Sequence, residues 1–173
     1  MSIISFFKEA GEKLFGHRGA AAPAGAPAPA AAPADPAALQ ARSAQANQDA
    51  AKAIERYIGS QGLKAAGLDV QYDGASQTVT VSGVAPDQAT KEKIVLCCGN
   101  VQGVATVNDL LTVAQPADEA RYYTVVRGDT LSAIAKKEYG NANAYMKIFE
   151  ANKPMLSNPD KIYPGQKLRI PPK

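Results

Sequence analysis

The side chains that most often carry out chemistry are few in this sequence, and they lie far apart. The only two cysteines, Cys97 and Cys98, are neighbours, and the only histidine is His17. A disulfide between adjacent residues is strained, because disulfides need a wider Cα separation than one peptide link supplies. The pair also lacks metal-ligand spacing, and no Ser-His-acid set or glycine-rich phosphate loop is evident. We therefore predict reduced, buried thiols at the end of a helix, in a protein that is not an enzyme.

The opening stretch "FFKEAGEKLF" (residues 6–15) gathers phenylalanines and a leucine ahead of an Ala/Pro-rich run. Three interpretations compete: a targeting sequence, a membrane-surface helix, or a segment that docks onto a distant domain. The stretch is too charged for a signal peptide and has few basic residues for a membrane-surface helix. No run in the chain approaches the length of a membrane span. We predict a cytoplasmic protein whose opening stretch docks, with a docking helix over residues 3–15 that binds no ion as the main alternative.

The length and composition of the chain limit its organisation. It has 173 residues and a net charge of +3, which leaves room for one medium or two small domains. This charge gives no electrostatic indication of nucleic-acid binding. Residues 20–38 are mostly alanine and proline, so they lack the apolar bulk for a core and cannot form a continuous helix. We predict an N-terminal docking segment over residues 1–16 and a flexible linker over residues 17–43.

Residues 44–114 show the pattern of a first small domain. Its first helix, within residues 49–63, places four apolar side chains on one face: Ala50, Ile54, Tyr57 and Ile58. Two strands follow around a turn at residues 73–74, and a second helix has residues 86–87 in its first turn and ends at Gly99. A third strand completes the order α-β-β-α-β. This order predicts an α+β domain with its helices on one face of a small sheet.

Residues 121–171 predict a second small domain with the order β-α-α-β. A strand over residues 122–126 precedes a helix that Thr130 caps and Gly140 ends. A second helix and a closing strand, "KLRIP", follow. Apolar residues at helical spacing define the buried faces of the two helices: Leu131, Ile134, Ala135 and Tyr139 in the first, and Tyr145, Ile148 and Phe149 in the second.

The second unit resembles a LysM domain through "YTVVRGDTLSAIA", "YGNANAYMKIFEANK" and "IYPGQKLRIP". The first unit resembles a BON domain through "VTVSGVA", "QATKEKIVLCCGNVQGV" and "ATVNDLLTV". Together with the opening stretch, the arrangement resembles a family of cytoplasmic bacterial potassium-binding proteins. The resemblance covers residues 1–16 and about 44–173, and it leaves out the Ala/Pro-rich run.

This resemblance implies that a potassium ion is held by main-chain carbonyl oxygens of the opening stretch and the BON domain. The implied ligands are the carbonyls of Phe7, Ala10, Glu12, Phe15, Gly99 and Val101. Gly11 and the glycines of "GNVQGV" can loosen a helix and leave carbonyls bare. Neutral carbonyls suit a large monovalent cation such as K⁺, with Rb⁺ or Cs⁺ as substitutes, whereas a carboxylate cage would favour divalent ions.

The family resemblance predicts a cytoplasmic K⁺ sensor or buffer in which binding is coupled to ordering. We expect a monomer whose partner is the potassium ion, with no nucleic acid, no stable membrane insertion and at most weak glycan binding by the LysM unit. The alternative is an envelope protein that binds peptidoglycan through LysM, beside residues 128–131 and after Asn152, and a membrane through BON. A third class is a scaffold linked to the stress response that has no small ligand.

Overall fold

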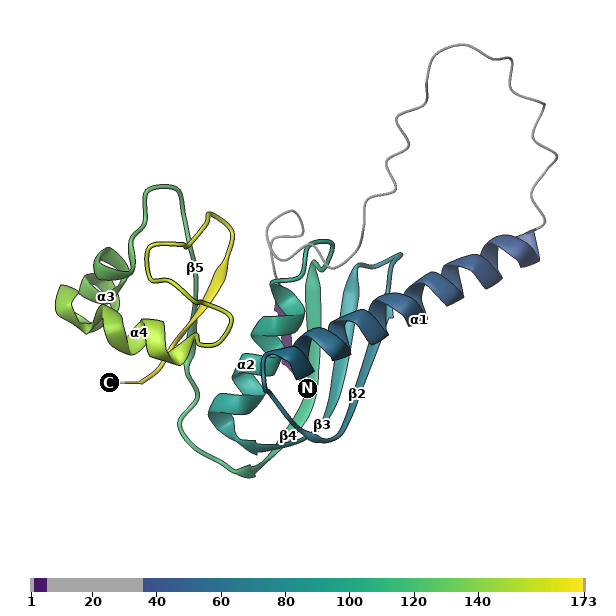
Figure 1. The fold of residues 1–173 in the computed structure, drawn as a ribbon, viewed down its shortest axis with the longest axis horizontal. Helices are drawn as coiled ribbons and strands as arrows, with labels where there is room; N and C mark the ends of the chain where they lie inside the picture. The colour runs from purple at the N-terminus through teal and green to yellow at the C-terminus, as the bar shows by residue number, and fades with distance from the viewer. Residues whose placement is uncertain (1, 6–35, 173) are drawn as a thin grey trace, which may run out of the picture.

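The computed structural model describes residues 2–5 and 36–172, which form two units (Figure 1). The first unit contains a sheet in the order β1-β4-β3-β2. Its strands are β1 (Ser2–Ser5), β2 (Ala66–Asp73), β3 (Thr78–Asp87) and β4 (Thr106–Gln115). The pair β3–β4 is parallel, and the pairs β1–β4 and β2–β3 are antiparallel. The predicted α+β class is confirmed.

Two helices, α1 (Pro36–Ser60) and α2 (Gln88–Gly99), cover one face of this sheet side by side (Figure 1). Strand residues point alternately to the two faces, so Val79 and Val81 of β3 face the helices and are fully buried. The core between the layers also contains Ile54, Ile58, Ile94, Val95, Val101, Val104 and Val107. Both cysteines are free thiols inside this core, as the sequence predicted.

Helix α1 begins earlier than the sequence predicted. Residues 36–43, which were assigned to the linker, are helical. Proline is tolerated in the first turn of a helix, where its missing N–H has no partner to lose. The alanine, leucine, glutamine and arginine residues that follow Pro36 all favour a helix. The first half of α1 is exposed and extends beyond the edge strand β2 (Figure 1).

The start of α2 also differs slightly from its prediction. Asp87 is not in the first turn but is the N-cap, where its carboxylate accepts a 2.7 Å hydrogen bond from the Thr90 N–H. Pro86 belongs to the end of β3. An N-cap aspartate satisfies a backbone donor that the helix itself cannot.

Strand β1 was not predicted at all. A docking helix over residues 3–15 was one prediction from the sequence, but residues 3–5 are extended and pair with β4. The rest of that predicted helix lies outside the described residues. A strand can dock through its backbone alone, because the edge of a sheet presents unpaired N–H and C=O groups. The start of the chain thus docks on the first unit by adding a strand.

The second unit confirms the predicted order β-α-α-β. It consists of β5 (Arg121–Thr124), α3 (Leu131–Tyr139), a single 3₁₀ turn η1 (Ala142–Ala144), α4 (Tyr145–Ala151) and β6 (Lys167–Ile170). The predicted caps of α3 are present. Thr130 accepts from the Ala133 N–H, and Gly140 ends the helix in the left-handed conformation at φ 78°. No helix in the described part of the chain is long and apolar enough to cross a membrane.

Candidate functional site

Two of the predicted ligand residues, Gly99 and Val101, lie together where α2 ends. Gly99 is the last residue of α2, and Val101 follows in the α2–β4 loop (residues 100–105). Both residues are buried. The last carbonyls of a helix have no donor four residues ahead within the helix, and they carry the negative end of its dipole. This end of the first unit therefore offers oxygen atoms and a field that favour a cation.

The hydrogen bonds of the α2–β4 loop leave acceptor capacity on its carbonyls. The Val101 carbonyl accepts a 3.1 Å bond from the Val104 N–H, and a carbonyl oxygen has a second lone pair. The Asn100 N–H donates to the Leu96 carbonyl at 2.9 Å, while the Val101 N–H reaches the Cys98 carbonyl only at 3.4 Å. The last distance is beyond the usual range of an N–H···O bond, and Val101 itself is a β-bridge residue.

The far half of the same loop is anchored to the sheet. The Tyr72 hydroxyl of β2 donates to the Gly103 carbonyl at 3.1 Å. The Ala105 N–H donates to the Gln77 carbonyl, in the turn between β2 and β3, at 2.8 Å. These contacts fix the point where the loop becomes β4.

The register of β1 brings the start of the chain to this loop. Ser5, the last residue of β1, pairs with Thr106, the first residue of β4. Because the pair is antiparallel, the chain leaves β1 at the end of the sheet where the α2–β4 loop enters β4. The other four predicted ligand residues follow Ser5 in the sequence and lie outside the described residues: Phe7, Ala10, Glu12 and Phe15.

Carboxylates do not form an obvious metal centre in the described residues. Residues 2–5 and 36–172 contain no group of three His, Cys, Asp or Glu side chains placed to hold a metal ion. Asp109, buried in β4, pairs instead with Lys91 of α2 at 3.2 Å. The two predicted ligand residues that are described, Gly99 and Val101, would offer main-chain carbonyl oxygens. The prediction that the protein is not an enzyme stays a prediction.

The second unit contacts α2 directly beside the site. The Asn100 side chain donates from Nδ2 to the Lys167 carbonyl of β6 at 3.0 Å and accepts from the Lys167 N–H at 3.1 Å. About two helical turns before Asn100, the buried Glu92 carboxylate pairs with the Arg169 guanidinium and accepts a 2.8 Å bond from the Ala120 N–H. Burial, and then the nearby Arg169 charge, hold the pKa of Lys93 below its ordinary value.

This junction was not predicted from the sequence. Asn100 follows the glycine that ends α2, so its residue type is explained locally as a helix cap. Its partner Lys167 is 67 positions away. A polar contact between residues that far apart produces no periodic pattern in the sequence, so a single sequence does not predict it.

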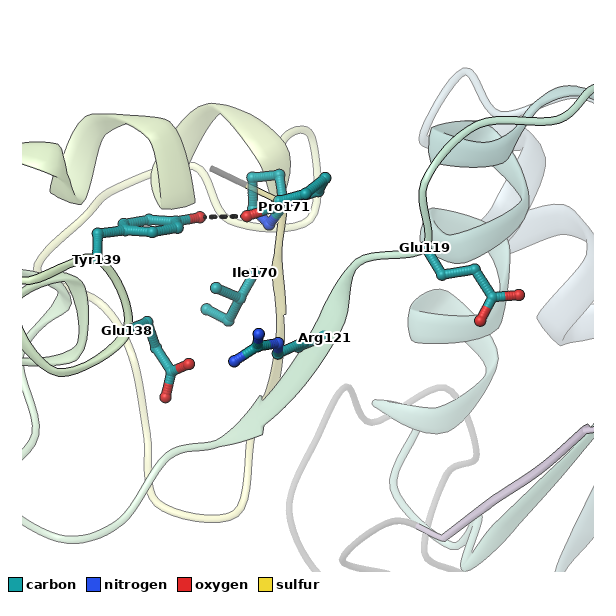
Figure 2. Close-up of a pocket in the computed structure, with 7 residues that line it drawn as sticks. Glu119, Arg121, Glu138, Tyr139, Ile170 and Pro171 are labelled. Carbon is teal, nitrogen blue, oxygen red and sulfur yellow. Dashed lines mark hydrogen bonds between the residues drawn. The ribbon is translucent and has the colours of Figure 1, made fainter.

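A separate pocket of about 380 Å³ lies on the second unit (Figure 2). Figure 2 shows the Arg121 and Glu138 side chains pointing toward one another across it, with Glu119 on the other side of β5. The Tyr139 hydroxyl closes one wall by donating to the Pro171 carbonyl at 2.7 Å. One arginine and two glutamates give the lining a net charge of −1, and the pocket contains none of the predicted ligand residues.

The family models for two domains match this chain. The BON domain model matches residues 45–115, and the LysM domain model matches residues 123–171. The first match covers α1 from residue 45 to the end of β4, and the second covers nearly all of the second unit. Both resemblances predicted from the sequence are thus confirmed.

Three curated proteins are similar to the chain. The potassium binding protein Kbp of Escherichia coli O6:H1 is 42% identical over 173 residues, which cover 99% of each chain. An uncharacterized protein of Deinococcus radiodurans is 48% identical over 82 residues, 41% of this chain and 32% of its own. The uncharacterized protein YqbP of Bacillus subtilis is 41% identical over 58 residues, 28% of this chain and 26% of its own. Of these, only the first match extends along the whole chain.

Proposed function

Because this chain belongs to the same family as the potassium binding protein Kbp of Escherichia coli, we propose that it binds potassium ions. The ion is held by main-chain carbonyl oxygens between the opening stretch and the end of α2. The proposed ligands are the carbonyls of Phe7, Ala10, Glu12, Phe15, Gly99 and Val101. Uncharged oxygens replace the hydration shell of a large monovalent ion without strongly favouring divalent ions.

The register of β1 against β4 is the observation that supports this site most directly. It pairs Ser5 with Thr106, so the opening stretch begins at the end of the sheet that carries the α2–β4 loop. If β1 ran in the opposite direction, the opening stretch would begin at the other end of the sheet. The buried end of α2 adds the negative end of a helix dipole to the same place.

Binding at this place would couple the ion to the order of the first unit. The ion would join the opening stretch to α2, and any ligand that binds only the folded state stabilises it. We infer a cytoplasmic sensor or buffer of K⁺ whose first unit loosens when the ion leaves. Rb⁺ and Cs⁺, which are also large and singly charged, are expected to substitute for K⁺.

Calorimetry of the purified full-length protein tests the proposal. Titration with KCl is expected to give a saturable heat, and titration with NaCl at the same ionic strength is expected to give none. RbCl and CsCl titrations then rank the large cations. Absent heats, or equal heats for K⁺ and Na⁺, would refute potassium binding.

Two variants test the role of the opening stretch. The first lacks residues 1–16. The second keeps β1 but replaces residues 6–15 by a Gly/Ser segment of the same length. Both are expected to lose the K⁺-dependent rise in melting temperature, because both lack the proposed ligands that precede residue 16. If the second variant keeps that rise, the ligands are not in residues 6–15, whatever the role of β1.

Glycan binding by the second unit is the alternative function, and the LysM family match supports it. The segment after Asn152 is partly occupied, because Met155 packs against the core of the first unit. A peptidoglycan pull-down combined with cell fractionation separates the two functions. Binding to peptidoglycan together with a periplasmic location would favour the envelope protein.

A further inference from the structure

We propose that Asn100 is a positioning residue for the potassium site, through which the second unit sets the carbonyls of Gly99 and Val101. This inference rests on the proposed function and concerns how the site is built. Asn100 lies between the two ligand residues in the sequence, and its side chain is bonded to β6 rather than to the first unit.

The contact between Asn100 and β6 fixes the side chain in one orientation. Its amide donates to the Lys167 carbonyl at 3.0 Å and accepts from the Lys167 N–H at 3.1 Å. These are the two bonds that the peptide group of a neighbouring strand would make. Since both bonds involve one residue of β6, rotation of the amide breaks both.

Strand β6 is built to receive this contact. In an antiparallel ladder, alternate residues direct their backbone groups to the same side. Lys167 and Arg169 are alternate residues of β6, separated by Leu168, so their N–H and C=O groups lie on the same edge of the strand. Asn152 makes the same two bonds with Arg169, at 2.8 Å each. Two asparagines, one from each unit, thus pair with alternate residues along one edge of β6.

The contact reaches the ligand carbonyls through planar peptide groups. The Gly99 carbonyl shares a peptide plane with the Asn100 N–H, and the Val101 N–H shares one with the Asn100 carbonyl. Within the helix end, the Val101 N–H reaches the Cys98 carbonyl only at 3.4 Å, a long bond for an N–H···O pair. The Asn100 side chain adds a constraint from outside the first unit.

The surroundings of Asn100 favour a positioning role over a purely stabilising one. The side chain is half-buried and borders a cavity of about 190 Å³ that Met155, Ser157 and Gln166 also line. Water can occupy a polar cavity of that size. Removal of the amide would therefore leave the Lys167 backbone accessible to water, which reduces the loss of stability but does not restore the geometry of the loop.

The test compares Asn100→Ala with the matched variant Asn152→Ala. Asn100 has φ −87°, so alanine fits its backbone. We expect Asn100→Ala to weaken K⁺ binding about tenfold in calorimetry, the effect of roughly one to two hydrogen bonds. Asn152→Ala removes the same bonds to β6 inside the second unit, and we expect it to lower the melting temperature but change the K⁺ affinity less than about twofold. Both titrations are made at a temperature where circular dichroism shows both variants folded.

The outcomes separate this inference from the proposed function. If the wild-type protein does not bind K⁺, the proposed function fails. If the wild-type protein binds K⁺ and Asn100→Ala binds it equally well, only the positioning role fails. The positioning role also fails if Asn152→Ala weakens K⁺ binding as much as Asn100→Ala does.

Hydrogen exchange of the wild-type protein gives an independent measurement. K⁺, but not Na⁺, should slow exchange of the Lys167 amide, and an unchanged rate contradicts the proposal.

Discussion

The two units stay folded by different means. The first unit encloses a core of large aliphatic side chains that are fully removed from water, among them Ile54, Ile58 and Ile94. The second unit is smaller and buries the polar Asn152, which bonds the Ile148 carbonyl of α4 as well as β6. A short chain buries a smaller fraction of its surface, so the second unit gains more of its stability from hydrogen bonds. Polar groups of its strand β6 also contact α2 and the residue that follows it: the Lys167 backbone bonds Asn100, and Arg169 pairs with Glu92.

Neighbouring residues of α2 show the same contrast. Lys91 pairs with Asp109 inside the first unit, whereas Glu92 pairs with Arg169 of the second. Adjacent positions on a helix point in directions about 100° apart, so one helix contacts the sheet on one side and β6 on another. Helix α2 therefore belongs energetically to both units, and its end carries two of the proposed ligands.

The largest effect is expected for Glu92→Ala, which breaks the link between the units. Arg169 would remain buried without its partner, and the Ala120 N–H would lose its acceptor. Loss of one partner of a buried ion pair costs about 3–5 kcal/mol. Urea denaturation should show this loss in the free energy of unfolding, with separate transitions for the two units.

The control for Glu92→Ala is Glu150→Ala. It removes an exposed ion pair with Lys153 on the second unit, and such pairs contribute less than about 1 kcal/mol. A similar loss in the two variants would mean that the junction is no more important than an ordinary surface contact.

A smaller effect, about 2–3 kcal/mol, is expected for Asn152→Ala. Without the side chain, the Arg169 N–H and carbonyl lose their partners, while the Ile148 carbonyl keeps the backbone N–H of residue 152 at 3.2 Å. Buried unsatisfied groups cost about 1–3 kcal/mol each. Thermal denaturation measures the loss. The exposed Asn143→Ala, in the same unit, should stay within about 0.5 kcal/mol of the wild type. If the two variants are equally stable, the hydrogen bonds of Asn152 are not a main source of stability in the second unit.

The sequence predicted those parts of both units that depend on local signals. Helical spacing and strand alternation predicted both element orders, and Thr130 and Gly140 predicted the ends of α3. The sequence did not predict β1, because four residues with no periodicity pair with a strand about a hundred positions away. It also did not predict that Asn100 and Lys167 meet. Contacts that require two separate units to be folded first leave no local pattern.

The candidate site also combines features that local sequence signals predict with features that depend on long-range contacts. Gly99 could be placed at the end of α2 because glycine commonly ends helices. The position of the opening stretch depends on the β1–β4 register, and no pattern in the sequence predicted that register. The ligand set was therefore reached through the family resemblance, and the structure adds the direction in which the chain leaves β1.

The thiols allow the first unit to be followed separately from the second, because both cysteines lie in the core of the first unit. A thiol reagent reaches them only when this unit opens. With K⁺ at about 100 times its dissociation constant, the folded state gains about 2.7 kcal/mol. Labelling should then slow about 100-fold relative to Na⁺ under conditions where opening is in rapid equilibrium. Equal rates in the two salts would show that the ion does not stabilise the first unit.

A further effect is a pH dependence that should also be confined to the first unit. Burial raises the pKa of the Cys97 thiol to about 12, from an ordinary value of 9.0. Between these values the unfolded chain has lost the proton and the folded chain has kept it, so stability falls as the pH rises. The contribution of Cys97 is about 1.4 kcal/mol per pH unit.

The variant Cys97→Ala tests this contribution. It should be less stable than the wild type at pH 7 because of the cavity, yet lose less stability between pH 9 and pH 11. Tyrosines that titrate in the same range contribute equally to both proteins, so the difference between the two pH profiles reports on Cys97 and on its effect on the neighbouring Cys98. Identical slopes would mean that the first unit opens before Cys97 ionises, and that its core is less closed than the buried cysteines indicate.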